Sequence, residues 1–95
     1  MKVRWSAGAL ADLRAITFYI DVRNAKAAQR VKQKIILASY QLRDFPQIGT
    51  AVHRADTRKL LVTGLPYILI YRVDGDLVKI SSVIGARMDR APDLL

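Results

Sequence analysis

The sequence predicts an α+β fold in which a helical hairpin packs on a small antiparallel sheet. The first half of the chain has apolar residues at helical spacing, and the second half consists of short alternating or wholly apolar runs that are typical of strands. A short alternating segment precedes the helices. The predicted element order is therefore β-α-α-β-β-β, and 95 residues suit a single domain over residues 1–95.

Residues 1–5 predict a short strand, because Val3 and Trp5 alternate with the basic Lys2 and Arg4. The expected N-cap of the first helix is Ser6, whose hydroxyl can accept a hydrogen bond from a free amide of the first turn. The apolar face of this helix consists of Ala9, Leu13, Ile16 and Ile20, at steps of three and four residues.

A second helix is expected to begin after Asn24, which is a good N-cap, and to end before Pro46. Its apolar face is formed by Ala28, Val31, Ile35, Ala38 and Leu42. Two helices joined by so short a connection predict an antiparallel hairpin.

The second half predicts a loop over residues 47–57 and strands over 59–63, 67–73 and 77–84. Gly49 is expected to adopt a left-handed or tight-turn conformation in the loop. The segment 67–73 is apolar on both faces, which predicts the central strand. Asp74-Gly75 predicts a two-residue hairpin with positive φ at both positions.

The chain is strongly basic. Sixteen Lys and Arg residues face eight acidic residues, all of them Asp, which gives a net charge of +8. Such an excess favours a polyanionic or acidic partner, namely a nucleic acid, an enzyme that acts on nucleic acid, or an acidic protein segment. A solvated basic surface is the alternative explanation.

Other features of the composition limit the chemistry. The absence of cysteine excludes disulfides and thiolate metal sites. His53 is the only histidine and stands in a polar loop, where a solvated side chain is expected rather than a catalytic or metal role. Neither a cofactor nor a metal is expected. No signal peptide or membrane span is apparent, so a cytoplasmic protein with no membrane partner is expected.

Several stretches, taken in order, resemble the ParE/RelE toxin superfamily of type II toxin–antitoxin systems over almost the whole chain. They are Trp5-Ser6, Tyr19-Ile20, Pro46-Gln47-Ile48-Gly49, Arg58-Lys59-Leu60, Pro66 to Val73, and Val83-Ile84-Gly85-Ala86-Arg87. The resemblance implies a toxin, and two functional branches share its fold.

The RelE-like branch cleaves mRNA on the ribosome, which requires cations for the phosphate and a group that moves protons. Arg87 matches the basic residue after the last strand, whereas Arg58 and Lys59 match only loosely. Ile84 stands where many relatives have His, and neither Tyr nor His follows Tyr71. The acid–base partner is therefore absent from the expected positions.

The ParE-like branch inhibits DNA gyrase and needs no catalytic residue, only a surface that stabilises one state of the enzyme–DNA complex. This branch is favoured, with Arg58, Arg72, Arg87 and Arg90 as the expected target-binding residues. Arg58 and Arg72 are expected near the open face of the sheet or its rim. In the alternative ribonuclease interpretation, Arg58, Lys59 and Arg87 bind phosphate, and the partners are the ribosome and mRNA. A third alternative is a non-catalytic relative that binds nucleic acid.

The resemblance also implies a cognate, ParD-like antitoxin with an acidic C-terminal segment. It is expected to contact exposed parts of the sheet and the helical hairpin, where the contacting residues are Arg23, Lys26, Arg30 and Lys34. Three of them form a line at i, i+4 spacing on the second helix, where like charges slightly destabilise an isolated helix. For the line by itself, a solvated face is the simpler explanation, so this assignment depends on the resemblance.

Overall fold

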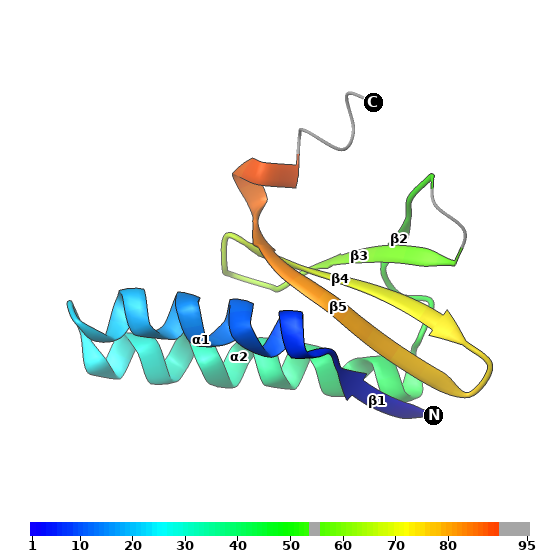
Figure 1. Ribbon diagram of the computed structural model, residues 1–95, viewed down its shortest axis with the longest axis horizontal. Helices are drawn as coiled ribbons and strands as arrows, with labels where there is room; N and C mark the ends of the chain where they lie inside the picture. The colour runs from blue at the N-terminus through cyan, green and yellow to red at the C-terminus, as the bar shows by residue number, and fades with distance from the viewer. Residues whose placement is uncertain (54–55, 90–95) are drawn as a thin grey trace.

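The computed structural model describes residues 1–53 and 56–89, with the side chains of all of these except residues 88 and 89. Figure 1 shows a helical hairpin beside a twisted sheet. The elements in chain order are β1 (Lys2–Trp5), α1 (Ala7–Asp21), α2 (Ala25–Asp44), β2 (Thr50–Ala51), β3 (Thr57–Leu61), β4 (Tyr67–Asp74), β5 (Leu77–Gly85) and the 3₁₀ helix η1 (Ala86–Asp89).

The five strands form one sheet in the order β1-β5-β4-β3-β2. The predicted α+β class and helical hairpin are confirmed. The expectation of a wholly antiparallel sheet was wrong at one edge, because β1 runs parallel to β5, with Val3 opposite Val78. Parallel neighbours require a long crossover, and the hairpin together with the three other strands supplies it.

Both predicted helix N-caps are present. The Ser6 hydroxyl accepts a hydrogen bond from the Ala9 amide at 3.0 Å, and the Asn24 side chain accepts one from the Ala27 amide at 3.0 Å. α2 ends at Asp44, shortly before Pro46, as expected. In the described part of the chain, no helix is long and apolar enough to cross a membrane.

The core lies between the hairpin and the sheet, with α1 packed on β5. Figure 1 shows that β2 and β3 extend away from the helices, at the far side of the sheet from β1. The buried core residues come from both helices and from the strands: Ala9, Leu13, Ile35, Ala38, Leu42, Val62, Leu69, Tyr71, Val78, Ile80 and Val83.

Two details of the second half differ from expectation. Thr50 and Ala51, predicted as loop, pair with Lys59 and Arg58 to form the two-residue strand β2, which is too short to leave a periodic pattern. In the β4–β5 hairpin, Asp74 still pairs with Leu77, so the turn residues are Gly75 and Asp76, and of these only Gly75 has a positive φ, 61°. A glycine with positive φ at the first position is the arrangement of a type II′ turn.

Gly49 is required for a different reason from the one predicted, because its φ is not positive. A Cβ at this position would lie 2.6 Å from the Tyr71 hydroxyl and 2.8 Å from the Lys59 carbonyl oxygen. The glycine therefore permits close packing of the loop against β3 and β4.

Candidate functional site

The side of the sheet that faces away from the helices, here called the open face, carries most of the basic strand residues. Leu69, Tyr71, Val78 and Ile80 point into the core, so the alternate positions on β4 and β5 lie on the open face. The register places Arg4, Lys79, Arg72 and Thr57 in one row across four strands. Ser81 is skipped in the pairing of β4 with β5, and this bulge shifts the alternation on β5, so the next row consists of Ser82, Ile70, Lys59 and Thr50.

The first of these rows contains three basic residues in succession, Arg4, Lys79 and Arg72, and all three are exposed. Lys79 donates a hydrogen bond to the Asp74 carboxylate at 3.3 Å, and the two residues form a surface ion pair near the turn of the β4–β5 hairpin. Sequence reasoning identified Arg72 but missed Arg4 and Lys79. Lys79 lies opposite Arg72 through the register of the antiparallel β4–β5 pair, and Arg4 joins them through the parallel pairing of β1 with β5. Alternation along a single strand reveals neither pairing.

The expectation that Arg58 and Arg72 lie near the open face or its rim holds for Arg72 but is wrong for Arg58, which lies on the opposite side of the sheet. Its partner on β4 is Tyr71, a core residue. The half-buried guanidinium donates to the Gly49 carbonyl oxygen at 2.7 Å and to the Gln47 carbonyl oxygen at 3.3 Å. Arg58 therefore holds the segment that leaves α2 against the sheet.

Tyr71 also binds the segment that precedes β2. Its hydroxyl accepts a hydrogen bond from the Gly49 amide at 2.9 Å, and its side chain is fully buried. Burial raises the pKa of Tyr71, whereas the Gly49 hydrogen bond and the nearby Arg58 charge oppose that rise. The hydroxyl is therefore a neutral structural group.

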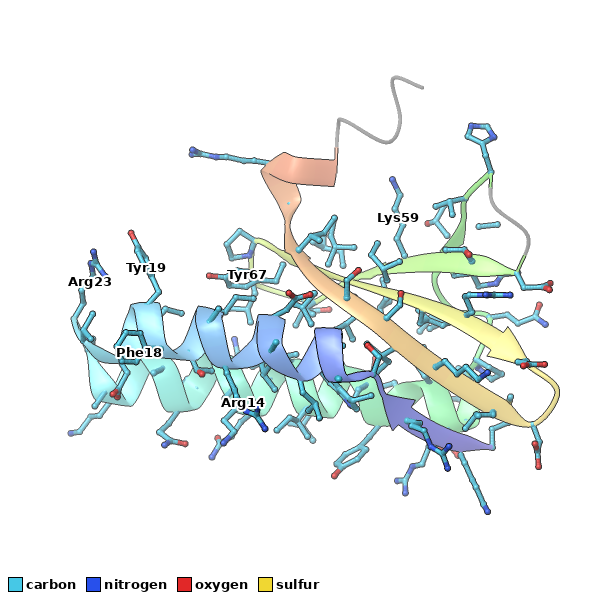
Figure 2. All side chains as sticks on the ribbon, in the orientation of Figure 1. Arg14, Phe18, Tyr19, Arg23, Lys59 and Tyr67 are labelled. Carbon is cyan, nitrogen blue, oxygen red and sulfur yellow. The ribbon has the colours of Figure 1, made fainter. Side chains whose placement is uncertain are left out.

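The remaining predicted target residues lie apart from one another. Arg87 is exposed on η1, which follows the opposite end of β5 from the β4–β5 turn, and Arg90 lies outside the described residues. Lys59 points away from the helices in Figure 2, on the face opposite Arg58. The set Arg58, Lys59 and Arg87 therefore does not converge on one phosphate-sized position.

No metal-binding cluster is formed by the His, Asp and Glu side chains within residues 1–53 and 56–87. His53 is exposed beyond the end of β2. The strand positions of the open face carry neither histidine, tyrosine nor glutamate. The face thus offers cations together with one carboxylate, Asp74, which is ion-paired with Lys79.

The helical hairpin carries a second candidate surface. Lys26, Arg30 and Lys34 are exposed along α2, as the spacing predicts. Leu37 is 62% exposed and Tyr40 is 49% exposed further along the same helix. Sequence reasoning overlooked these two residues, although both stand outside the apolar stripe of α2. This surface therefore combines basic and apolar side chains.

Arg23 differs from the other three predicted antitoxin contacts. Its Nη1 donates to the Tyr19 carbonyl oxygen at 2.7 Å, and its guanidinium lies 4.0 Å from the centre of the Tyr19 ring. Figure 2 shows this pair at the end of the hairpin, with Phe18 and Arg14 directed to the other side of α1. Phe18, which is 69% exposed, lines an open groove of about 400 Å³ between the helices.

Comparison with known families gives one match that covers most of the chain. Residues 3–90 match the family described as the ParE toxin of the type II toxin–antitoxin system parDE. Two relatives are also similar. Toxin Y4kP of Sinorhizobium fredii is 35% identical over 85 residues, which cover 90% of this chain and 88% of that protein. Toxin RelE2 of Caulobacter vibrioides is 38% identical over 79 residues, covering 83% and 88% respectively.

Solved structures show the same fold. The chromosomal ParDE system of P. aeruginosa includes a chain that aligns with a TM-score of 0.73 and 24% identity, over 90% of this chain and 95% of that one. The intact E. coli RelBE toxin–antitoxin complex aligns with a TM-score of 0.59 and 19% identity, over 86% and 92%. At these identities the likeness concerns the fold alone.

Proposed function

The chain belongs to the ParE toxin family of type II toxin–antitoxin systems, and from this membership we propose that it inhibits DNA gyrase and is neutralised by a cognate antitoxin. A gyrase poison acts by binding one state of the enzyme–DNA complex more tightly than the others, so it requires a shaped surface and no proton transfer. The basic open face and Arg87 are the parts of the surface that we assign to the target.

The observation that carries the choice of gyrase is the make-up of the open face. Its strand positions hold Arg4, Lys79, Arg72 and Lys59 but no histidine or tyrosine, and the carboxylate among them, Asp74, is ion-paired with Lys79. Cleavage of RNA by its own 2′-hydroxyl depends on general acid–base catalysis, which contributes typically 10²–10⁴-fold. Binding to a gyrase–DNA complex has no such requirement.

The test is a supercoiling assay with purified gyrase and relaxed plasmid, run with a parallel cleavage assay. The toxin is expected to inhibit supercoiling and to accumulate linear DNA, and addition of the antitoxin is expected to restore activity. Arg87→Gln should weaken inhibition, while Lys32→Gln, which removes the same charge from α2, should not. Full gyrase activity at micromolar toxin would contradict the proposal.

Ribosome-dependent mRNA cleavage is the second candidate, favoured by the 38% identity to a protein named toxin RelE2. In that case Lys59 and Arg87 would bind phosphate. Toeprinting on translating ribosomes separates the two candidates, because cuts in the message at the ribosomal A site together with unchanged gyrase activity would support the ribonuclease and exclude the gyrase poison.

The antitoxin contact is assigned to the helical hairpin. Lys26, Arg30 and Lys34 provide positive charge for an acidic segment, and the exposed Leu37 and Tyr40 provide apolar anchors. The solved relatives with this fold include chains from the ParDE and RelBE systems, which supports an antitoxin partner for this chain.

A further inference from the structure

One basic residue from each of four adjacent strands forms a continuous band across the open face. Arg4 of β1 lies opposite Lys79 of β5, which lies opposite Arg72 of β4. Lys59 of β3 pairs with Ile70 and is thus the diagonal neighbour of Arg72 on the same face. We call Arg4, Lys79, Arg72 and Lys59 the cross-strand basic band.

The band is electrostatically unfavourable for the folded protein alone. Like charges directly opposite each other on neighbouring strands destabilise a sheet, and this occurs twice in succession, at Arg4–Lys79 and at Lys79–Arg72. Asp74 forms an ion pair with the band through Lys79. Asp56 and Asp76 lie in the turns that precede β3 and β5.

We propose that the cross-strand basic band binds the sugar–phosphate backbone of duplex DNA. Neighbouring strands lie about 4.8 Å apart, so the band is about 14 Å long. A single DNA strand carries one charge per roughly 3.4 Å of helix axis, so this length faces about four phosphates. Direct contact with the DNA backbone would let the toxin bind DNA as well as protein in a gyrase–DNA complex.

One feature of the open face favours duplex DNA over a single-stranded nucleic acid. The strand positions of the open face hold no aromatic side chain, whereas proteins that hold single strands usually stack bases on aromatic rings. Leu61, on the same face of β3 as Lys59, is 58% exposed. An acidic protein segment anchored there is therefore the competing occupant, and the antitoxin measurement below is the arm of the test that addresses it. The inference rests on the proposed function only for the identity of the duplex as gyrase-bound DNA.

Fluorescence anisotropy with a short fluorescein-labelled duplex, in the absence of gyrase, tests the band over a series of salt concentrations. The double variant Arg4→Gln/Arg72→Gln should lower affinity by about tenfold or more at 0.1 M salt and reduce the slope of log K against log salt by about two. The matched control Lys26→Gln/Arg30→Gln removes the same charge from α2 and should leave the slope unchanged.

A third variant predicts the opposite sign. Asp74→Asn removes the carboxylate that holds Lys79, so affinity for the duplex should rise by about twofold to fivefold. A mere stability defect cannot produce this gain. Circular dichroism of each variant verifies that it is folded.

Three outcomes would overturn the band assignment: equal losses from the band variant and the α2 control, tighter binding of a single-stranded RNA of the same length than of the duplex, or loss of antitoxin affinity with DNA affinity unchanged. A failed gyrase assay with intact DNA binding would refute only the proposed function, so the two failures are distinguishable.

Discussion

Because Gly49 has no Cβ, the segment between α2 and β2 can pack directly against the Tyr71 side chain. Gly49→Ala should destabilise the protein by about 1–3 kcal/mol, because its Cβ would come within 2.8 Å of two groups that cannot move freely, the buried Tyr71 ring and the Lys59 backbone. Urea denaturation measures the loss. Gly85→Ala is the matched control, since a Cβ there meets nothing within 4 Å, and it should leave stability unchanged or slightly higher.

Tyr71→Phe keeps the packing of the ring and removes the acceptor of the Gly49 amide. The unpaired buried amide should cost about 1–3 kcal/mol at neutral pH. A loss below a few tenths of a kcal/mol would show that this hydrogen bond contributes little.

The same variant isolates a pH dependence. Because burial raises the pKa of Tyr71 in the folded protein, the unfolded chain releases this proton first, near its ordinary value of about 10. The contribution to stability is therefore complete below pH 10 and is lost as pH rises toward the folded pKa. Between pH 9 and 11, the wild type should lose more stability than Tyr71→Phe. Parallel curves would contradict this.

At the scale of elements, the short strand β1 is completed by groups from α1. β1 ends at Trp5, so the edge of β5 beyond Ile80 has no strand partner on that side. The Ser6 hydroxyl donates to the Ser81 carbonyl oxygen at 3.2 Å, and the Asp12 carboxylate accepts from the Val83 amide at 3.0 Å. The beginning of α1 thus takes over the hydrogen bonding of the missing strand.

Asp12→Ala should therefore destabilise the protein by about 1–3 kcal/mol, because the Val83 amide would lose its acceptor in a partly buried position. Asp21→Ala, on the same helix, is the control. It removes an exposed carboxylate from the C-terminal end of α1, where negative charge is slightly unfavourable, and should be neutral or mildly stabilising. Thermal unfolding followed by circular dichroism compares the two variants, and equal melting temperatures would refute a bonding role for Asp12.

Elements with a local signal were predictable from the sequence, and those that depend on distant pairing were not. The caps Ser6 and Asn24 and the end of α2 before Pro46 follow from side chains within a few residues of each helix end. The parallel direction of β1 and the two-residue strand β2 arise from contacts with β5 and β3, and no local pattern encodes them. Asp12 was missed because its partner is 71 residues away in the chain.

In the candidate site, too, residues defined by local spacing were predictable, whereas residues placed by strand pairing were not. The basic line on α2 was predictable because helical spacing alone defines it. Arg58 and Arg72 could not be assigned to opposite faces without the register between β3 and β4, which the connection over residues 62–66 leaves open in the sequence. The position of Arg90 remains a prediction, since it lies outside the described residues.

For the whole molecule, the net charge of +8 should govern the speed of complex formation. Neutralising Lys26, Arg30 and Lys34 together should slow association with the antitoxin and flatten its salt dependence, while Leu37→Ala should mainly speed dissociation. Stopped-flow mixing of toxin and antitoxin separates the two rates. Unchanged association after the triple neutralisation would remove the hairpin from the assignment.

Of the four predicted antitoxin contacts, Arg23 should matter least. Arg23→Gln should change the association rate less than the same change at Lys26, Arg30 or Lys34, because the Arg23 guanidinium donates a hydrogen bond to the Tyr19 carbonyl oxygen.

The pairing of Val3 with Val78 also has a consequence for biosynthesis. At bacterial elongation speeds of 5–20 residues per second, about 4 to 15 seconds separate the synthesis of the first strand from that of its neighbour. A nascent chain that is interrupted in this interval has no β5 on which to close its sheet. A complete sheet is thereby restricted to polypeptides that have been translated through β5, and any activity that depends on the sheet is restricted with it.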